Sequence, residues 1–166
     1  MLQPVVRRTW GPRGDTPIQR RWERHDRLSG VSAVTVSPRR RHLDLYYALQ
    51  EHNLGVADLE TFVAELLEHF PRGIILVMDR WSVHLSVANQ LRRRFPRRMR
   101  IEWLPSYAPE LNPDEQVWMR TKYMDLANFC PEDLVELAQA VRESLEHTRS
   151  QQSLLRSFFE YTKLKL

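Results

Sequence analysis

Two carboxylates occupy positions where folding can bring side chains together for chemistry. Asp79 follows the apolar run of residues 74–78, which predicts a buried strand that delivers this side chain to the edge of a sheet. Glu115 follows Asn112 and Pro113, a cap residue and a first-position proline that predict the first turn of a helix. Carboxylate oxygens gathered at one edge suit Mg²⁺ or Mn²⁺, because these hard cations keep coordination positions open for water and phosphate. The sequence therefore predicts a metal site that uses Asp79 and Glu115.

Both carboxylates lie in longer motifs. One reads Asp79-Arg-Trp-Ser-Val-His84, and the other reads Leu104-Pro-Ser-Tyr-Ala-Pro-Glu-Leu-Asn-Pro-Asp-Glu115-Gln-Val-Trp118. Together they resemble the catalytic domain of DDE-type transposases of the mariner-like bacterial insertion-sequence group, and the second, proline-punctuated motif is highly specific. The similarity extends from Arg8-Thr-Trp10 to Leu126-Ala-Asn-Phe129, nearly the whole chain. Arg80 departs from the pattern, since the family usually has asparagine there.

The resemblance implies an α/β fold with a ribonuclease-H-like mixed sheet flanked by helices. It implies that Asp79 and Glu115 are the second and third catalytic carboxylates and bind Mg²⁺ (or Mn²⁺), with His84 as an auxiliary residue. The implied reaction is DNA cleavage at transposon ends followed by strand transfer to target DNA. The implied partners are these DNAs and a second transposase chain, through self-association or binding to a full-length transposase.

The first catalytic aspartate of the family is expected shortly before the segment matched by Arg8-Thr-Trp10. Residues 2–8 contain no acid, so we expect the first strand to be truncated or missing and this chain alone to be inactive. Two other functions stay open: a non-catalytic DNA-binding or regulatory transposase remnant, and a stand-alone metal nuclease of the ribonuclease H type.

Each acidic residue also has a structural interpretation. Asp79 could cap a turn at the end of its strand. The run Asn112-Pro-Asp-Glu115 fits a capping box, in which Glu115 reaches back to the cap amide. Asp114 is interpreted as a favourable first-turn charge, because negative groups stabilise a helix N-terminus without any catalysis.

Arginines are concentrated in two segments. Residues 1–41 hold ten arginines against three acids, and residues 92–100 hold six arginines and no acid. Arginine binds phosphate in a fork and releases counterions from DNA, so this pattern predicts phosphate-facing surfaces, although a solvated basic face explains it equally well. The candidate nucleic-acid-binding residues are Arg7, Arg8, Arg13, Arg92, Arg93, Arg94 and Lys122.

Hydrophobic patterning predicts one domain over residues 1–166, with residues 131–166 as a C-terminal helical extension. Strands are expected at 31–36, 42–48, 74–78 and 100–104, and helices from Asp58 to Phe70, from Ser86 to Phe95, from Pro113, from Pro131 and near the C-terminus. The first 28 residues are expected to form a loop or short hairpin.

Composition excludes several classes of protein. One cysteine, Cys130, leaves no internal disulfide and no zinc pattern, and it suits a reducing cytoplasm. No apolar run approaches the roughly 18 residues of a membrane span, and the arginine-rich start lacks a signal peptide's apolar segment. The sequence therefore predicts a cytoplasmic protein with no membrane partner.

Overall fold

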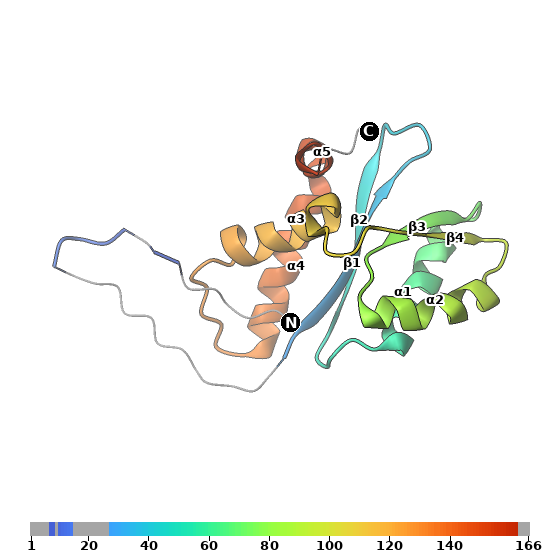
Figure 1. Cartoon of the computed structure of the whole chain (residues 1–166). Helices are drawn as coiled ribbons and strands as arrows, with labels where there is room; N and C mark the ends of the chain where they lie inside the picture. The colour runs from blue at the N-terminus through green and yellow to red at the C-terminus, as the bar shows by residue number, and fades with distance from the viewer. Residues whose placement is uncertain (1–6, 9, 15–26, 163–166) are drawn as a thin grey trace.

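The chain folds in the element order that the sequence predicts. The computed structural model describes residues 7, 8, 10–14 and 27–162, and its elements are arranged as shown in Figure 1. They are β1 (Ser29–Val36), β2 (Leu43–Gln50), α1 (Val56–His69), β3 (Ile74–Met78), α2 (Ser82–Arg94), β4 (Met99–Trp103), α3 (Pro113–Arg120), α4 (Leu134–Ser150) and α5 (Gln152–Tyr161), with a short 3₁₀ turn η1 (Pro109–Leu111) and a π-helical turn η2 (Thr121–Asp125). The loop predicted for the first 28 residues lies mostly outside the described residues.

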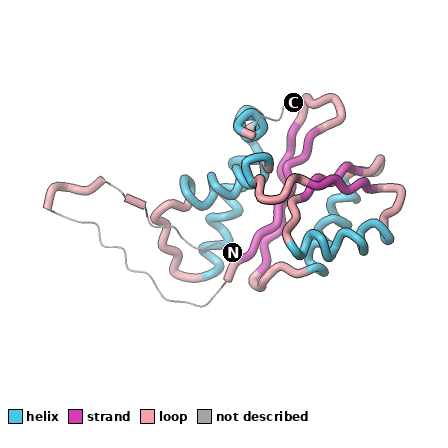
Figure 2. Tube along the Cα trace, in the orientation of Figure 1, coloured by secondary structure: helices cyan, strands magenta, loops and turns pink. Residues whose placement is uncertain are grey.

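The β1–β2 hairpin separates two hydrophobic cores. Its strands pair antiparallel from Ser29 opposite Gln50 to Val36 opposite Leu43. Because side chains alternate along a strand, one face of the hairpin packs on α1 and α2 and the other packs on α3, α4 and α5. Figures 1 and 2 show the hairpin running between these two groups of helices.

Strands β3 and β4 pair in parallel, because helix α2 connects them as a βαβ crossover. Gly73 permits the turn into β3, since it has a φ of +85° and an added Cβ would lie 2.3 Å from the Arg98 carbonyl oxygen. Ile74 and Leu76 pack against α1 and α2, whereas Ile75 and Val77, which alternate with them, are 68% and 55% exposed. One face of this strand is therefore open.

The sheet differs from the single mixed sheet that we expected. Among the described residues, β1 pairs only with β2 and β3 pairs only with β4, so there are two separate ladders.

Three helix starts differ from the sequence prediction, and in α1 and α4 the observed capping contact explains the difference. Helix α1 begins after Gly55, whose N–H donates to the Asp58 carboxylate (2.7 Å), so Asp58 is inside the first turn. Helix α4 begins after Asp133, whose side chain accepts from the Glu136 N–H (2.8 Å), and Pro131 precedes it. Helix α2 begins at Ser82, four residues before the predicted start.

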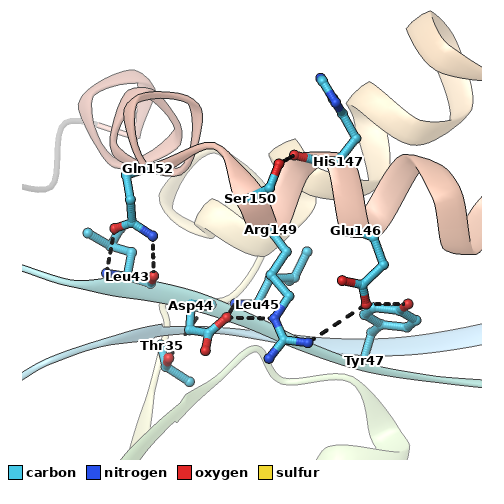
Figure 3. Close-up of polar contacts among 10 residues, drawn as sticks. All are labelled: Thr35, Leu43, Asp44, Leu45, Tyr47, Glu146, His147, Arg149, Ser150 and Gln152. Carbon is cyan, nitrogen blue, oxygen red and sulfur yellow. Dashed lines mark hydrogen bonds and ion pairs between the residues drawn. The ribbon is translucent and has the colours of Figure 1, made fainter.

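Helices α4 and α5 are attached to β2 by polar contacts as well as by the core (Figure 3). The Gln152 side chain accepts from the Leu43 N–H (3.0 Å) and donates to the Leu43 carbonyl (2.7 Å), which completes the backbone bonding of that residue. Arg149 donates to Asp44 (2.8 Å). The residues predicted as a C-terminal helical extension thus share the core of the domain. Among the described residues, no helix has the length and apolar character needed to cross a membrane.

Helix α3 packs directly on strand β1 through Trp118. A Cβ added at Gly30 would lie 2.3 Å from the Cη2 atom of Trp118, so only glycine leaves room for this indole ring. Val117, the residue before it, is fully buried in the same core. Gly30 and Trp118 therefore set how closely the helix approaches the strand.

We expect Gly30→Ala to lower the free energy of unfolding by about 1–3 kcal/mol, because the methyl group must displace Trp118 or the helix. Chemical denaturation monitored by tryptophan fluorescence measures this change. Gly55→Ala is the control, since an added Cβ there approaches nothing closer than the Asp58 carboxylate at 3.7 Å. Equal stability of the two variants would show that Gly30 does not control the docking of α3.

Candidate active site

Asp79 follows the last residue of β3 and binds two groups through one oxygen. Its Oδ1 accepts from the Trp81 N–H (2.9 Å) and lies 2.6 Å from Nδ1 of His84. The side chain is 41% exposed, and its Oδ2 makes no hydrogen bond to any described residue. Asp79 thus caps the turn into α2, as its structural interpretation expects, and its second carboxylate oxygen has no partner among the described residues.

His84 lies in the first turn of α2 and is fixed on two sides. Its Nδ1 lies 2.6 Å from Oδ1 of Asp79, and because a carboxylate oxygen accepts, this nitrogen donates the hydrogen bond. The Trp81 ring contacts the imidazole edge-on, with ring centroids 5.2 Å apart. His84 therefore lies directly beside Asp79 in the fold, and its auxiliary role stays a prediction.

The first turn of α3 excludes the capping-box interpretation of Glu115. The Asn112 side chain caps this helix by accepting from the Asp114 N–H (3.1 Å), and the Asn112 N–H donates to the Pro109 carbonyl (3.0 Å). The cap amide is therefore already bonded to another group. Glu115 forms no side-chain hydrogen bond or ion pair with the described residues, which leaves its carboxylate available.

Asp114 is a residue whose importance the sequence analysis missed. The Ser32 hydroxyl of β1 lies 2.7 Å and 2.8 Å from its two carboxylate oxygens, and Trp118 also donates to it. Burial raises the pKa of Asp114 to about 6, and the charge of Glu115 adds to this shift, while the bonds from Ser32 and Trp118 and the charge of His84 oppose it. Asp114 is thus an acid of the first helical turn, as the sequence predicts, and in addition it is bonded to β1, which the sequence analysis did not anticipate.

The spacing of two pairs of residues is the signal that could have identified this contact. Gly30 and Ser32 lie on one face of a strand, and Asp114 and Trp118 lie on one face of a helix. A small residue and a hydroxyl on the strand match an indole and a carboxylate on the helix. The match becomes visible only when the two elements are known to be neighbours.

The two motifs meet through His84 and Asp114. His84 bonds to Asp79 and is near enough to Asp114 for its charge to lower the pKa of that carboxyl group. Asp114 also precedes Glu115 in sequence, and the charge of Glu115 raises the pKa of Asp114. The end of β3 and the start of α3 therefore lie near each other, and we call Asp79, His84, Asp114 and Glu115 the carboxylate cluster.

The donor atoms of this cluster fit a hard divalent cation, because Asp79 and Glu115 offer oxygen ligands and Asp79 retains an unbonded oxygen. Two protein carboxylates are a small set for such an ion. Within the described ranges, no group of three or more histidine, cysteine, aspartate or glutamate side chains is arranged to hold a metal. The cluster can therefore supply part of a metal site.

The predicted nucleic-acid-binding residues are spread over the molecule. Arg92, Arg93 and Arg94 end helix α2, which is 13 residues and so about 20 Å long and begins beside Asp79. Arg94 donates to Glu60 (2.8 Å), whereas Arg92 and Arg93 are exposed. These arginines lie far from the carboxylate cluster.

The other predicted basic residues lie near the C-terminal end of α3 or in the first described loop. The Arg7 N–H donates to Asn128 (2.7 Å), and its guanidinium lies 5.2 Å from the centre of the Tyr123 ring. Lys122 is half-buried in η2, and Arg8 and Arg13 are exposed.

Comparisons with known proteins agree with this geometry. Residues 1–133 match the DDE superfamily endonuclease family, so the chain belongs to that family. The fold is similar to a crystal structure of the Mos1 mariner paired end complex with Mn, with a TM-score of 0.65 and 13% identity over 98% of this chain. It is also similar to the Mos1 strand transfer complex, with a TM-score of 0.59 and 13% identity over 98% of this chain. No curated protein sequence matches the chain.

These similarities establish the fold, which is the ribonuclease-H-like α/β fold of the mariner transposase catalytic domain, as the sequence predicted. The chain covers 49% and 48% of the two Mos1 chains, so it spans about half the length of those proteins.

The raised pKa of Asp114 predicts how stability depends on pH. Because the folded state binds this proton more tightly than the unfolded state does, the resulting stabilisation is complete below about pH 4 and is lost as the pH rises through about 6. We expect the free energy of unfolding to fall by on the order of 2 kcal/mol across this window. Asp114→Asn should remove most of this dependence, since the amide has no proton to lose.

Denaturant unfolding at several pH values, without divalent metal, measures this effect. Asp133→Asn is the matched control, because asparagine also caps helices and Asp133 lies at the start of α4. Identical pH profiles for the wild-type chain and Asp114→Asn would contradict the burial of this carboxyl group.

Proposed function

We propose that this domain carries out the DNA cleavage and strand transfer of an insertion sequence, with Asp79 and Glu115 as ligands of Mg²⁺ or Mn²⁺. Membership of the DDE superfamily endonucleases supports this reaction class. The proposal is supported by two observations. Asp79 and Glu115 each retain oxygen atoms without a described partner, and Asp114, next to Glu115, is influenced by the charge of His84, which is bonded to Asp79.

The residues of the cluster have separate roles in this proposal. Asp79 and Glu115 would hold the ion, and His84 orients Asp79 by binding its other oxygen. A bound divalent ion supplies activation of water or of a 3′ hydroxyl and stabilises the charge that develops on the phosphate. The exposed rim of the sheet lets a DNA strand approach these carboxylates.

A third carboxylate is needed in addition, and we propose that it arrives on a further strand. Among the described residues, β1 pairs only with β2 and β3 only with β4, so each of these ladders has an edge that could accept another strand. A strand added between the two ladders would complete one mixed sheet. An acid at the end of that strand would then reach the carboxylate cluster.

We expect the chain of 166 residues to show little or no strand cleavage, and a longer version that includes such a strand to cleave DNA with Mg²⁺ or Mn²⁺. In the longer version, Asp79→Asn and Glu115→Gln should each lower cleavage by at least about 100-fold, because both remove a metal ligand. DNA affinity should stay within about twofold, since neither change removes a phosphate-binding cation. Gel assays of cleavage and anisotropy titrations measure the two effects.

Glu110→Gln is the matched control, since Glu110 is an exposed acid in the turn before α3. Cleavage by Glu115→Gln at the wild-type rate would exclude Glu115 as a ligand. Absence of cleavage in every longer version would favour the second candidate function, a non-catalytic DNA-binding or regulatory transposase remnant. The small number of ligands among the described residues is the observation in favour of that alternative.

A further inference from the structure

The turn between β1 and β2 carries three consecutive arginines, Arg39, Arg40 and Arg41, all of them exposed. Arg156 of α5 lies against this turn, because its Nη2 donates to the carbonyl of Arg40 (3.2 Å) and to that of Arg41 (2.7 Å). We call these four residues the arginine tip. They come from two segments far apart in sequence, so no single motif reveals them.

The turn that carries the arginine tip is held in one conformation by its own backbone. The Ser37 hydroxyl accepts from the N–H groups of Arg41 (3.2 Å) and His42 (3.1 Å), and the Ser37 carbonyl accepts from the Arg40 N–H (2.7 Å). Arg40 adopts a φ of +54° to close the turn. A fixed turn loses little conformational entropy on binding, which favours affinity.

Helix α5 braces the same turn. Gln152 binds both backbone groups of Leu43 at the start of β2, as Figure 3 shows, and Arg156 lies one turn further along the helix. Arg156 also covers two turn carbonyls, whose partial negative charge would otherwise oppose an approaching anion. The brace therefore fixes the position of the arginines and raises the local positive potential.

Two acids of the neighbouring part of β2 and α4 are bonded to other residues. Asp44 pairs with Arg149 (2.8 Å), and Glu146 accepts from the Tyr47 hydroxyl (2.8 Å), both visible in Figure 3. Glu160, one turn beyond Arg156 on α5, is the nearest remaining acid in that helix. The exposed side chains of Arg39 and Arg41 therefore place positive charge on the turn, which favours a ligand with several negative charges.

We propose that the arginine tip binds backbone phosphates of a DNA duplex, at a site separate from the carboxylate cluster. This inference rests on the proposed function, because it takes DNA as the ligand. Ser32, which contacts Asp114, lies on β1, and Ser37 directly follows the end of that strand, so the two are five residues apart, or about 17 Å at 3.4 Å per residue. That length equals about five base pairs of duplex, roughly half a helical turn.

The distance between the carboxylate cluster and the arginine tip determines how a bound duplex would contact the tip. A duplex with one phosphate at the carboxylate cluster and its axis along β1 presents other phosphates to the tip. Arginine binds phosphate oxygens in a fork without reading the bases, so the contact adds affinity and orientation but no sequence preference. The tip therefore orients the duplex relative to the carboxylates.

Fluorescence anisotropy of the full chain with a labelled blunt duplex, titrated from about 50 to 200 mM salt, tests this proposal. The double variant Arg39→Ala/Arg41→Ala should weaken binding about tenfold. It should also reduce the slope of log affinity against log salt by about 1–2, because each lost phosphate contact removes about 0.9. Unchanged circular dichroism would show that the fold is intact.

The matched control is Arg72→Ala/Arg142→Ala, which removes the same two charges from other exposed positions. It should change the slope by less than about 0.5. Equal effects of the two double variants, or no binding of duplex DNA by the wild-type chain, would overturn the proposal. Cleavage by the longer version is measured separately. If that version cleaves DNA but the two double variants affect duplex binding equally, only this inference is refuted.

Discussion

The docking of helix α3 on strand β1 determines where Glu115 lies. Trp118 fills the space above Gly30, and Asp114 binds the hydroxyl of Ser32. These two contacts lie on one face of the helix and fix both its distance from the strand and its rotation. Glu115 follows Asp114 and so points about 100° around the helix axis from the strand contact. A core contact on one face of the helix thereby sets the direction of a functional side chain on another.

The β1–β2 hairpin connects this docking contact to the rest of the molecule. Its two faces belong to two hydrophobic cores, so close packing on both sides keeps the hairpin rigid. Near its start it holds α3 through Gly30 and Ser32, and at its turn it carries arginines braced by α5. The same rigid element therefore sets the distance between the carboxylate cluster and a basic surface. The open face of β3, by contrast, is where the fold has apolar surface still to cover.

Much of this arrangement follows from local sequence. The strand before Asp79 and the helix after Asn112 were predictable because an apolar run and a cap followed by proline are short-range signals. The link between Asp79 and His84 follows from their spacing. The role of Asp114 was not predictable, because its burial depends on Ser32, a residue 82 positions away in sequence. The start of α4 was misplaced for a related reason, since Pro131 and Asp133 both favour a helix start and the hydrogen bond of Asp133 decides between them.

The central claim is that Asp79 and Glu115 bind the same divalent ion, and paramagnetic broadening by Mn²⁺ tests it most directly. Substoichiometric Mn²⁺ should broaden the NMR signals of His84 and of the Trp118 indole, which lie in and beside the carboxylate cluster. It should leave the fully exposed indole of Trp10 sharp. Both Asp79→Asn and Glu115→Gln should abolish the selective broadening. Uniform broadening of all three signals, or selective broadening that persists in either variant, would contradict a shared metal site.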